Sequence, residues 1–210
     1  MKRTILFLLV LLTGASSIQA KTDKYGTWVE LEFSKELFKK FELSFIPEVR
    51  WQDDFTVDEY QFDAKLGYEP FKFLNVAVAY RNKTNVKNKG NENTNRFVFD
   101  LAGKEKLGRF DASLRTRVTN YSDESDIKTT FIRPRIKFVY DIKGNKIAPF
   151  TSYELFRDVH EKNWQKGRFD IGFTRKFGKI HRIGFYYRLQ DYFNDRNSIN
   201  IVGIDYRLKI

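Results

Sequence analysis

The chain has 210 residues, and its 38 Lys and Arg against 27 Asp and Glu leave a formal net charge of +11. This length suits one barrel or sandwich domain, and no Pro-, Gly- or Ser-rich linker indicates a second domain. The absence of Cys and the presence of only two His exclude a disulfide framework, a thiolate metal site and a Cys nucleophile and argue against a multi-His zinc site, so we expect no cofactor.

The first element is an apolar run near the N-terminus, over residues 5–12. Lys2 and Arg3 precede it, and a stretch of small residues ending in Ala20 follows it, which is the pattern of a secretory signal peptide. The run is shorter than the roughly twenty apolar residues that a membrane-spanning helix needs. We therefore expect residues 1–20 to be a cleaved signal peptide and residues 21–210 to form the exported domain, with a net charge of 36 − 27 = +9.

Apolar and polar residues alternate with a period of two from residue 27 to the C-terminus, in about eleven segments. The last segment, residues 198–210, is the clearest, because Val202, Ile204 and Tyr206 share one face while Asp205 and Arg207 share the other. The other segments are residues 27–34, 41–51, 59–68, 74–81, 96–101, 110–118, 132–140, 150–157, 168–174 and 183–190. The longer of these segments, at nine residues or more, match tilted membrane-crossing strands, which need about nine to eleven residues, better than usual soluble strands. An exported chain with no second long apolar run can enter a membrane only as a barrel.

The connections between these segments alternate in length. Short connections with Gly or Pro cover residues 69–72, 103–109, 141–146 and 178–182, and longer polar ones cover residues 52–57, 82–94, 120–129, 158–167 and 191–197. Aromatic residues lie beside the short turns (Tyr68, Phe71, Phe73, Tyr140, Phe177) and beside the long loops (Trp51, Phe55, Tyr80, Tyr121, Trp164, Tyr192, Phe193). Outer-membrane barrels have short periplasmic turns, longer outer loops and aromatic girdles at both ends. We therefore predict an all-β fold, an antiparallel up-and-down transmembrane β-barrel of about ten to twelve strands.

Three places depart from this regular pattern. Residues 27–34 would run downward from the outer end and make the strand count odd, whereas bacterial single-chain barrels usually have an even number. We expect either an unusual first strand there or a further strand elsewhere that the alternation does not reveal. Pro134 lies in mid-strand and lacks a ladder donor, so it predicts a local break in pairing. Residues 150–157 alternate less cleanly, which predicts a bulge.

Alternation does not say which face of each strand points inward. A soluble periplasmic lipid-binding barrel would place the apolar face inside and the charges outside, and its strands would alternate as well. We favour the membrane barrel because of strand length, loop asymmetry, the aromatic girdles and the terminal strand. The apolar faces are also nearly free of charge, as a lipid-facing surface requires, since Arg or Lys at the midplane costs about 2 to 4 kcal/mol.

Four stretches give the chain a resemblance to a known family. They are Thr27-Trp28 followed by Glu30 and Glu32, the Glu-Val-Arg-Trp step at residues 48–51, the Pro-Phe-Thr-Ser-Tyr-Glu-Leu-Phe segment at residues 149–156, and Gly-Ile-Asp-Tyr-Arg at residues 203–207. In these the chain resembles the domain-of-unknown-function family of small Gram-negative outer-membrane barrels. The resemblance implies the barrel fold and no established activity. Ile210 stands where such barrels typically end in Phe.

The polar faces would place fourteen charged side chains along the lumen. They are Glu30, Glu32, Glu48, Arg50, Asp63, Arg81, Arg115, Arg117, Arg133, Arg135, Lys137, Glu154, Arg188 and Arg207. Barrel closure should bring Arg207 and Lys209 beside the acidic early strands. One interpretation is that the charges pair across a narrow interior that side chains largely fill. The other is that the basic strip from Arg115 to Lys137 draws small acidic solutes or oligosaccharides through a narrow anion-preferring pore, which an excess of lumenal cations over carboxylates would favour.

Neither histidine indicates catalysis. A Ser hydrolase needs a His within reach of both a Ser and a carboxylate, but His160 lies in a long loop and His181 in a short turn, and neither lies on a strand near a conspicuous Ser. We therefore expect the protein not to be an enzyme and both His to be solvated loop residues. Glu154 fits a lumenal partner for a nearby Arg better than a catalytic acid.

The predicted export and the charge pattern also limit which classes of partner the protein can have. Nucleic acid is not expected, because the Lys and Arg follow strand alternation and form no contiguous patch. The sequence predicts a protein of the Gram-negative outer membrane whose partners are outer-membrane lipid, the barrel assembly machinery during insertion and, for a pore, a small anionic solute. We expect a structural or interaction component with a charge-paired, largely plugged lumen. The narrow anion-preferring porin and the soluble lipid-binding barrel remain the alternatives.

Overall fold

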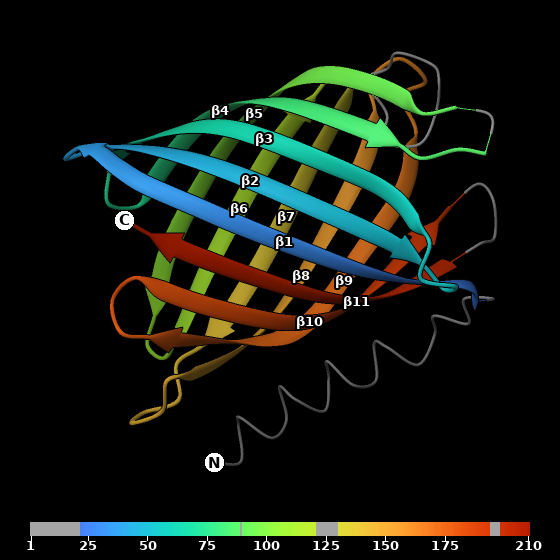
Figure 1. Cartoon of the computed structure of the whole chain (residues 1–210). Coiled ribbons are helices and arrows are strands. Elements are labelled where there is room, and N and C mark those ends of the chain that lie inside the picture. Colours follow the sequence, from blue (N-terminus) through green and yellow to red (C-terminus); the bar gives the residue numbers. More distant parts are fainter. Residues whose placement is uncertain (1–21, 89, 121–129, 194–197) are drawn as a thin grey trace.

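The computed structural model describes residues 22–88, 90–120, 130–193 and 198–210, and within them eleven strands close into one barrel in chain order (Figure 1). The strands are β1 (Thr22–Phe38), β2 (Phe41–Gln52), β3 (Val57–Phe71), β4 (Leu74–Asn85), β5 (Glu92–Leu107), β6 (Phe110–Thr119), β7 (Phe131–Tyr140), β8 (Ile147–Asp158), β9 (Trp164–Phe177), β10 (His181–Tyr192) and β11 (Ser198–Lys209). The described residues include no helix long and apolar enough to cross a membrane. The predicted signal peptide, residues 1–20, lies outside the described residues.

The barrel closes through one parallel pair. β1 pairs in parallel with β11, with Glu30 opposite Asp205 and Glu32 opposite Arg207, while every other neighbouring pair is antiparallel. Closing an odd number of strands that alternate in direction forces one pair to be parallel. The prediction of an all-β barrel of ten to twelve strands is therefore confirmed, but uniform antiparallel pairing is wrong at this seam. The odd segment over residues 27–34 is the middle of β1, the unusual first strand.

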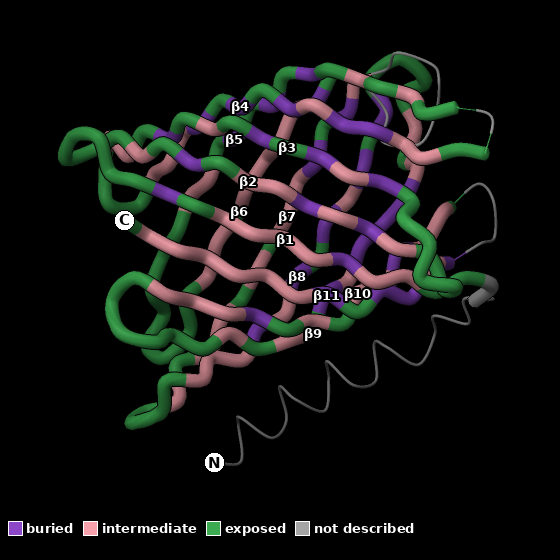
Figure 2. The backbone as a smooth tube through the Cα atoms, in the orientation of Figure 1, coloured by how far each residue is buried: buried purple, intermediate pink, exposed green. Residues whose placement is uncertain are grey.

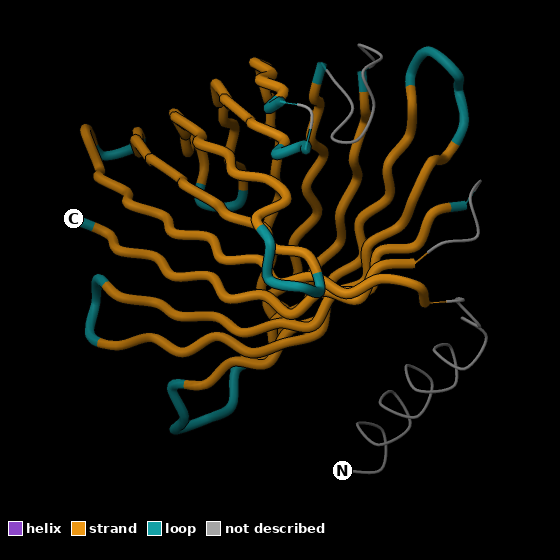
Figure 3. The backbone as a smooth tube through the Cα atoms, turned by 45° about the vertical axis from the view of Figure 1, so that its right-hand side comes forward, coloured by secondary structure: helices purple, strands orange, loops and turns teal. Residues whose placement is uncertain are grey.

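Two rims differ in their connections. The rim that holds the C-terminus, here called the turn rim, joins β1 to β2, β3 to β4, β5 to β6, β7 to β8 and β9 to β10 (Figures 1 and 3). At this rim Gly108, Gly144 and Gly178 adopt positive φ, which tight turns require and residues with a Cβ rarely adopt. The opposite rim, here called the loop rim, holds the start of β1 and the other five connections. The sequence-predicted division into two kinds of connection thus corresponds to the two ends of the barrel.

The apolar rows point outward and the polar rows inward. Large apolar side chains exposed on the outer wall include Phe45, Phe62, Leu66, Val78, Phe99, Leu101, Leu114, Ile136, Ile171, Phe173 and Val202. The residues between them on the same strands, such as Glu48, Asp63, Asp100 and Arg133, are charged and buried. This arrangement is the reverse of the apolar interior expected for a soluble lipid-binding barrel. Tyr192 is an exception to the predicted girdle, because its ring lies 5.1 Å from Lys166 Nζ on the inner side.

The two predicted irregularities are both present. The ladder between β7 and β8 pairs Ile132 with Arg157 and then resumes only at Arg135 with Glu154, so pairing is interrupted at Pro134. Pairing of β8 with β9 shifts register between Phe156 and Arg157, which is the irregularity expected over residues 150–157. Both breaks lie on β8, whose buried inner residues include Glu154, Phe156 and Asp158.

Candidate functional site in the barrel lumen

All fourteen charged residues expected to line the lumen lie on the inner face of the wall. They are Glu30 and Glu32 on β1, Glu48 and Arg50 on β2, Asp63 on β3, Arg81 on β4, Arg115 and Arg117 on β6, Arg133, Arg135 and Lys137 on β7, Glu154 on β8, Arg188 on β10 and Arg207 on β11. Each is buried or half-buried. Further buried inner charges were not among the fourteen, namely Glu59, Lys83, Arg96, Asp100, Asp158, Lys166, Arg168 and Asp170. The same alternation would have found most of them, because they occupy polar positions of the same strands.

The early strands hold one chain of ion pairs. Arg50 on β2 binds Glu48 at 2.5 Å and Glu59 of β3 at 2.8 Å. Glu59 also binds Lys83 of β4 at 2.5 Å. Next to them, the Arg81 guanidinium donates two hydrogen bonds of 2.7 Å to the two oxygens of Asp63. Such fork-to-fork geometry is the strong form of the Arg–carboxylate interaction.

The middle strands hold a second set of pairs. Arg117 donates two hydrogen bonds of 2.7 Å to Asp100. Glu154 on β8 accepts from Arg115 of β6 at 2.5 Å and from Arg133 of β7 at 3.3 Å. Because Arg115 reaches over β7 to Glu154, this contact depends on barrel curvature and could not be read from neighbouring strands.

The later strands and the seam complete the ring of pairs. Asp170 accepts from Arg188 at 2.6 and 3.0 Å and from the Ser152 hydroxyl at 3.0 Å. At the seam, Arg207 hydrogen-bonds Glu42 and lies 3.6 Å from Glu32. Lys209 lies 3.4 Å from both Glu36 and Glu42. The expectation that closure brings Arg207 and Lys209 beside acidic early strands is confirmed.

Buried aromatic rings also lie among these charges, and several guanidinium groups surround Trp28 and Phe156, neither of which was predicted as lumenal. The Trp28 ring has the guanidinium carbons of Arg50, Arg188 and Arg168 at 3.8, 4.9 and 5.1 Å from its centre. Phe156 has those of Arg133 and Arg168 at 4.2 and 4.6 Å. Such contacts are attractive because the ring face carries negative charge density. A signal was present, since Trp28 shares the parity of Glu30 and Glu32, but the aromatic residue was read apart from the polar row.

The packed side chains are concentrated toward the loop rim. Figure 2 shows buried stretches of the wall gathered at the end opposite the C-terminus. The charged side chains there are almost completely buried, with 1% of Lys83 and 9% of Arg50 exposed. Among the described residues, the buried carboxylates are Glu48, Glu59, Asp63, Asp100, Glu154, Asp158 and Asp170, and the buried cations are Arg50, Arg81, Lys83, Arg96, Arg133, Lys166 and Arg168. The half-buried Arg115, Arg117 and Arg188 pair with three of these carboxylates. The loop-rim half is therefore a filled interior rich in ion pairs.

The half toward the turn rim holds inner charged side chains that are more exposed. Inner side chains near this rim are partly exposed, with 28% of Glu42, 26% of Arg207 and 38% of Arg182 accessible. Its inner wall also carries many small residues, namely Gly67, Ala77, Ala102, Ser113, Ser152, Gly172 and Gly184. We call the part of the lumen that these residues line the turn-rim vestibule. Neighbouring residues cover two of these glycines, since the Asp205 side chain lies over Gly184 and Tyr186 lies beside Gly172.

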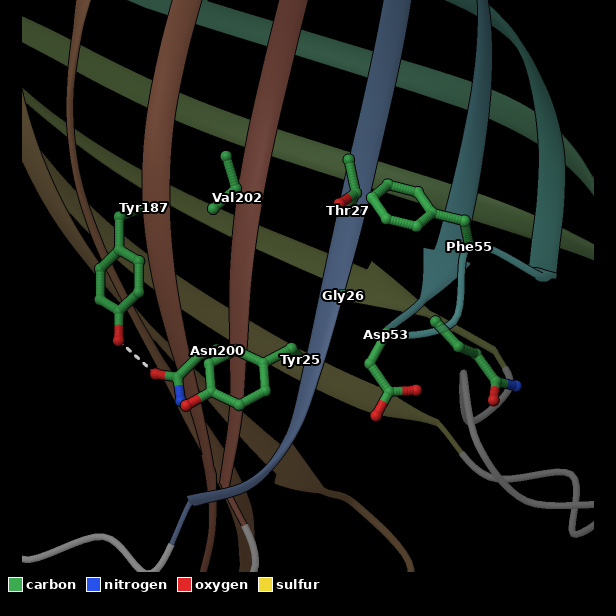
Figure 4. Close-up of a pocket in the computed structure, with 9 residues that line it drawn as sticks. Tyr25, Gly26, Thr27, Asp53, Phe55, Tyr187, Asn200 and Val202 are labelled. Atoms are coloured by element: carbon green, nitrogen blue, oxygen red, sulfur yellow. Dashed lines mark hydrogen bonds between the residues drawn. The ribbon is translucent and has the colours of Figure 1, made fainter.

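A groove of about 250 Å³ lies on the outer wall beside the seam, at the loop rim (Figure 4). Tyr25, Thr27 and Val202 border it, and the Tyr187 hydroxyl donates to the Asn200 side-chain oxygen at one side. Its lining is mostly apolar and aromatic, and the carboxylate of Asp53 is its one charged group. The groove therefore belongs to the aromatic edge of the outer wall and not to the charged interior.

The two histidines lie apart from each other, and the described residues form no metal-binding group. His181 Nδ1 lies 2.7 Å from the Tyr206 hydroxyl, so this histidine is hydrogen-bonded and not simply solvated. His160 is exposed in the connection after β8. Within the described ranges, no group of three or more His, Asp or Glu side chains could hold a metal ion.

Comparison with known proteins identifies a family for this chain, but that family has no known activity. A family model described as "Protein of unknown function (DUF2490)" matches residues 25–200. No curated protein matches the sequence. The matched range runs from β1 into β11 and therefore includes nearly the whole barrel.

Proposed function

The chain belongs to the DUF2490 family, whose function is unknown, and we propose from its own barrel that it is a non-enzymatic outer-membrane protein, a structural or interaction component with a plugged lumen. A Gram-negative bacterium would export it through a cleaved N-terminal signal, and the barrel assembly machinery would insert it. Its lipid contacts would be made by the outward apolar rows. A protein partner would meet it at the exposed rims.

The observation that carries this proposal is the inverted polarity of the wall. A band of Phe, Leu, Ile and Val faces outward, while ion pairs such as Arg81–Asp63 and Arg117–Asp100 face inward. In water such a wall would expose a large continuous apolar surface, which soluble monomers avoid. In a bilayer the same surface faces hydrocarbon, and the closed ladder satisfies the backbone groups.

Fractionation with a heat-modifiable gel shift tests the membrane assignment. We expect the protein in the outer-membrane fraction, and we expect unheated and boiled samples to migrate differently because the folded barrel resists detergent. A soluble protein whose mobility does not change on boiling would contradict the proposal and favour the soluble lipid-binding barrel.

Bilayer conductance tests the plug. We expect the wild type to show no steady conductance, because ion pairs and the Trp28 and Phe156 rings fill the loop-rim half. Trp28→Ala removes the ring that three Arg side chains surround, so it should produce conductance or raise it. The matched control is Trp164→Ala, because Trp164 is exposed at the loop rim and lies outside the plug.

A narrow anion-preferring pore is the second candidate. It is favoured by Arg135 and Lys137, two inner cations for which no carboxylate of the described residues lies within ion-pair distance. If the wild type conducts and prefers anions, the Arg133→Glu, Arg135→Glu, Lys137→Glu variant should reverse that preference. Absence of conductance in both proteins would support the plugged barrel.

A further inference from the structure

We propose that Arg115, Arg135 and Lys137 form an oxyanion site at the inner end of the turn-rim vestibule, and that it binds a dianionic phosphate group. This site goes beyond a plugged structural barrel, because it makes the open half a receptor for a small solute or a phosphorylated molecule. It does not depend on conduction, since the ligand enters and leaves through the same rim.

The first support is a cationic pair that the wall places face to face. Arg115 of β6 and Arg135 of β7 are direct partners in the ladder. Like charges opposite one another on neighbouring strands are destabilising unless something between them is negative. The nearest carboxylate is Glu154, the ladder partner of Arg135 on β8. Yet Glu154 is bound by Arg115 at 2.5 Å and by Arg133 at 3.3 Å, so it is shared among several cations.

The second support is a pair of buried hydrogen-bond donors that have no acceptor. The Nε atoms of Arg115 and Arg135 are buried and have no hydrogen-bond partner. A buried donor without an acceptor costs about 1 to 3 kcal/mol, and such groups in native proteins usually have a partner, including bound ions. An oxyanion between the two guanidinium groups would accept from both.

Lys137 adds a third cation on the same inner row. It follows Arg135 by two residues, so both side chains point inward from β7. Its Nζ lies 3.9 Å from the centre of the Phe150 ring, and no carboxylate of the described residues lies within ion-pair distance of it. Ser113 and Ser152 are its ladder partners on the two sides. The ammonium group is therefore held by a ring and flanked by hydroxyl-bearing residues, an environment that suits a phosphate oxygen.

The wall around these residues determines the route of entry. Toward the turn rim the inner face carries the small, half-buried Ala102 and Ser113, and the charged side chains of Arg182 and Arg207 there are partly exposed. Toward the loop rim the next inner side chains are Arg133, Glu154 and Phe156, which are buried. A ligand can therefore reach the site from the turn rim alone.

The charges define the class of ligand. Arg135 and Lys137 together carry two positive charges that no described carboxylate offsets within ion-pair distance, which matches one dianion. The planar fork of Arg binds phosphate through two parallel hydrogen bonds, and Lys binds it as a point charge. A monovalent ion such as chloride would satisfy one charge only and should bind more weakly.

Calorimetric titration with inorganic phosphate tests the site on the purified chain in a non-ionic, phosphate-free detergent. We expect saturable one-to-one binding to the wild type that equimolar chloride does not reproduce. Arg135→Gln combined with Lys137→Gln should weaken it by at least about tenfold, since a hydrogen bond to a charged group contributes about 1.5 to 3 kcal/mol. The matched control, Lys104→Gln with Lys106→Gln, removes the same charge from the same rim and should leave binding within about twofold of wild type.

Acetylation of lysines locates the site within one molecule. Phosphate should slow modification of Lys137, measured on its peptide by mass spectrometry, and leave Lys104 and Lys106 unaffected. Absence of phosphate binding by the wild type, or equal loss of binding in the control and test variants, would overturn the proposal. The gel shift reports separately whether each variant is a folded barrel, so failure of this site is distinguishable from failure of the membrane assignment.

Discussion

The two halves of the lumen differ although the same eleven strands build both. From mid-barrel to the loop rim, the inner positions hold large charged and aromatic side chains, and 1% of Lys83 and 5% of Arg81 are exposed. Toward the turn rim, the same strands place Gly, Ala and Ser at many inner positions, and 28% of Glu42 is exposed. Whether a narrow barrel is closed or open therefore depends on side-chain size along each strand, and strand number does not decide it.

The two halves also differ in how strongly their charged side chains interact. In the loop-rim half, ion pairs are buried and each charge needs its partner, because an unpaired charge in that environment is costly. In the vestibule, water screens the charges and pairs contribute little. Substitutions that remove one partner should thus have large effects in the first half and small ones in the second.

Glu154→Gln is expected to have the largest effect. It removes the carboxylate that Arg115 and Arg133 share and leaves their guanidinium groups facing one another. Breaking a buried pair by removing one partner costs about 3 to 5 kcal/mol. We expect a loss of that size in the free energy of unfolding, measured by urea titration in detergent micelles with the gel shift as readout.

The control for this prediction is Asp111→Asn. Asp111 is an exposed carboxylate on β6, close to the turn rim, so the variant loses the same charge without emptying the buried network. It should change stability by less than about 0.5 kcal/mol. Equal losses in both variants would mean that the loop-rim half is no more packed than the vestibule.

Gly203→Ala should have an intermediate effect, at the boundary between the halves. A Cβ at Gly203 would overlap the ring of Tyr186, which lies against Gly203 on β11. Overpacking of this kind typically costs about 1 to 3 kcal/mol. Gly103→Ala is the matched control, because the nearest atom to its Cβ would be the Phe73 carbonyl oxygen at 3.9 Å. In a Tyr186→Ala background the cost of Gly203→Ala should vanish, and a persistent cost would place its origin in the backbone.

Much of the barrel wall could be predicted from the sequence, because apolar and polar residues alternate along each strand and so mark its two faces. Alternation around Val202 and Asp205, the break at Pro134 and the irregularity near Phe156 all act locally, so they are readable without a fold. The direction of the faces was harder, since a period of two is symmetric with respect to inside and outside. At the seam, closure of the last strand on the first was expected but its direction was not, because the parallel pair depends on the exact number of strands, which is odd.

The sequence predicted which charged residues line the lumen, but it did not predict which of them contact each other. Parity identified Arg115, Arg133 and Glu154 as inner residues, but the contact of Arg115 with Glu154 crosses a strand and depends on register and curvature. Trp28 shows a second limit, since an aromatic residue on a polar face was not recognised as part of a charged interior. Both gaps concern three-dimensional neighbours, which local periodicity does not encode.

Lys104→Gln should have the smallest effect and gives the most direct measure of the open half. Lys104 hydrogen-bonds Glu69, yet 57% of its side chain and 43% of that of Glu69 are exposed. A pair this accessible should contribute less than about 0.5 kcal/mol, and added salt should abolish even that. The same urea titration at low and high salt measures it. A cost above about 1 kcal/mol that salt does not change would mean that water does not reach the vestibule, and the two halves would then differ in composition but not in accessibility.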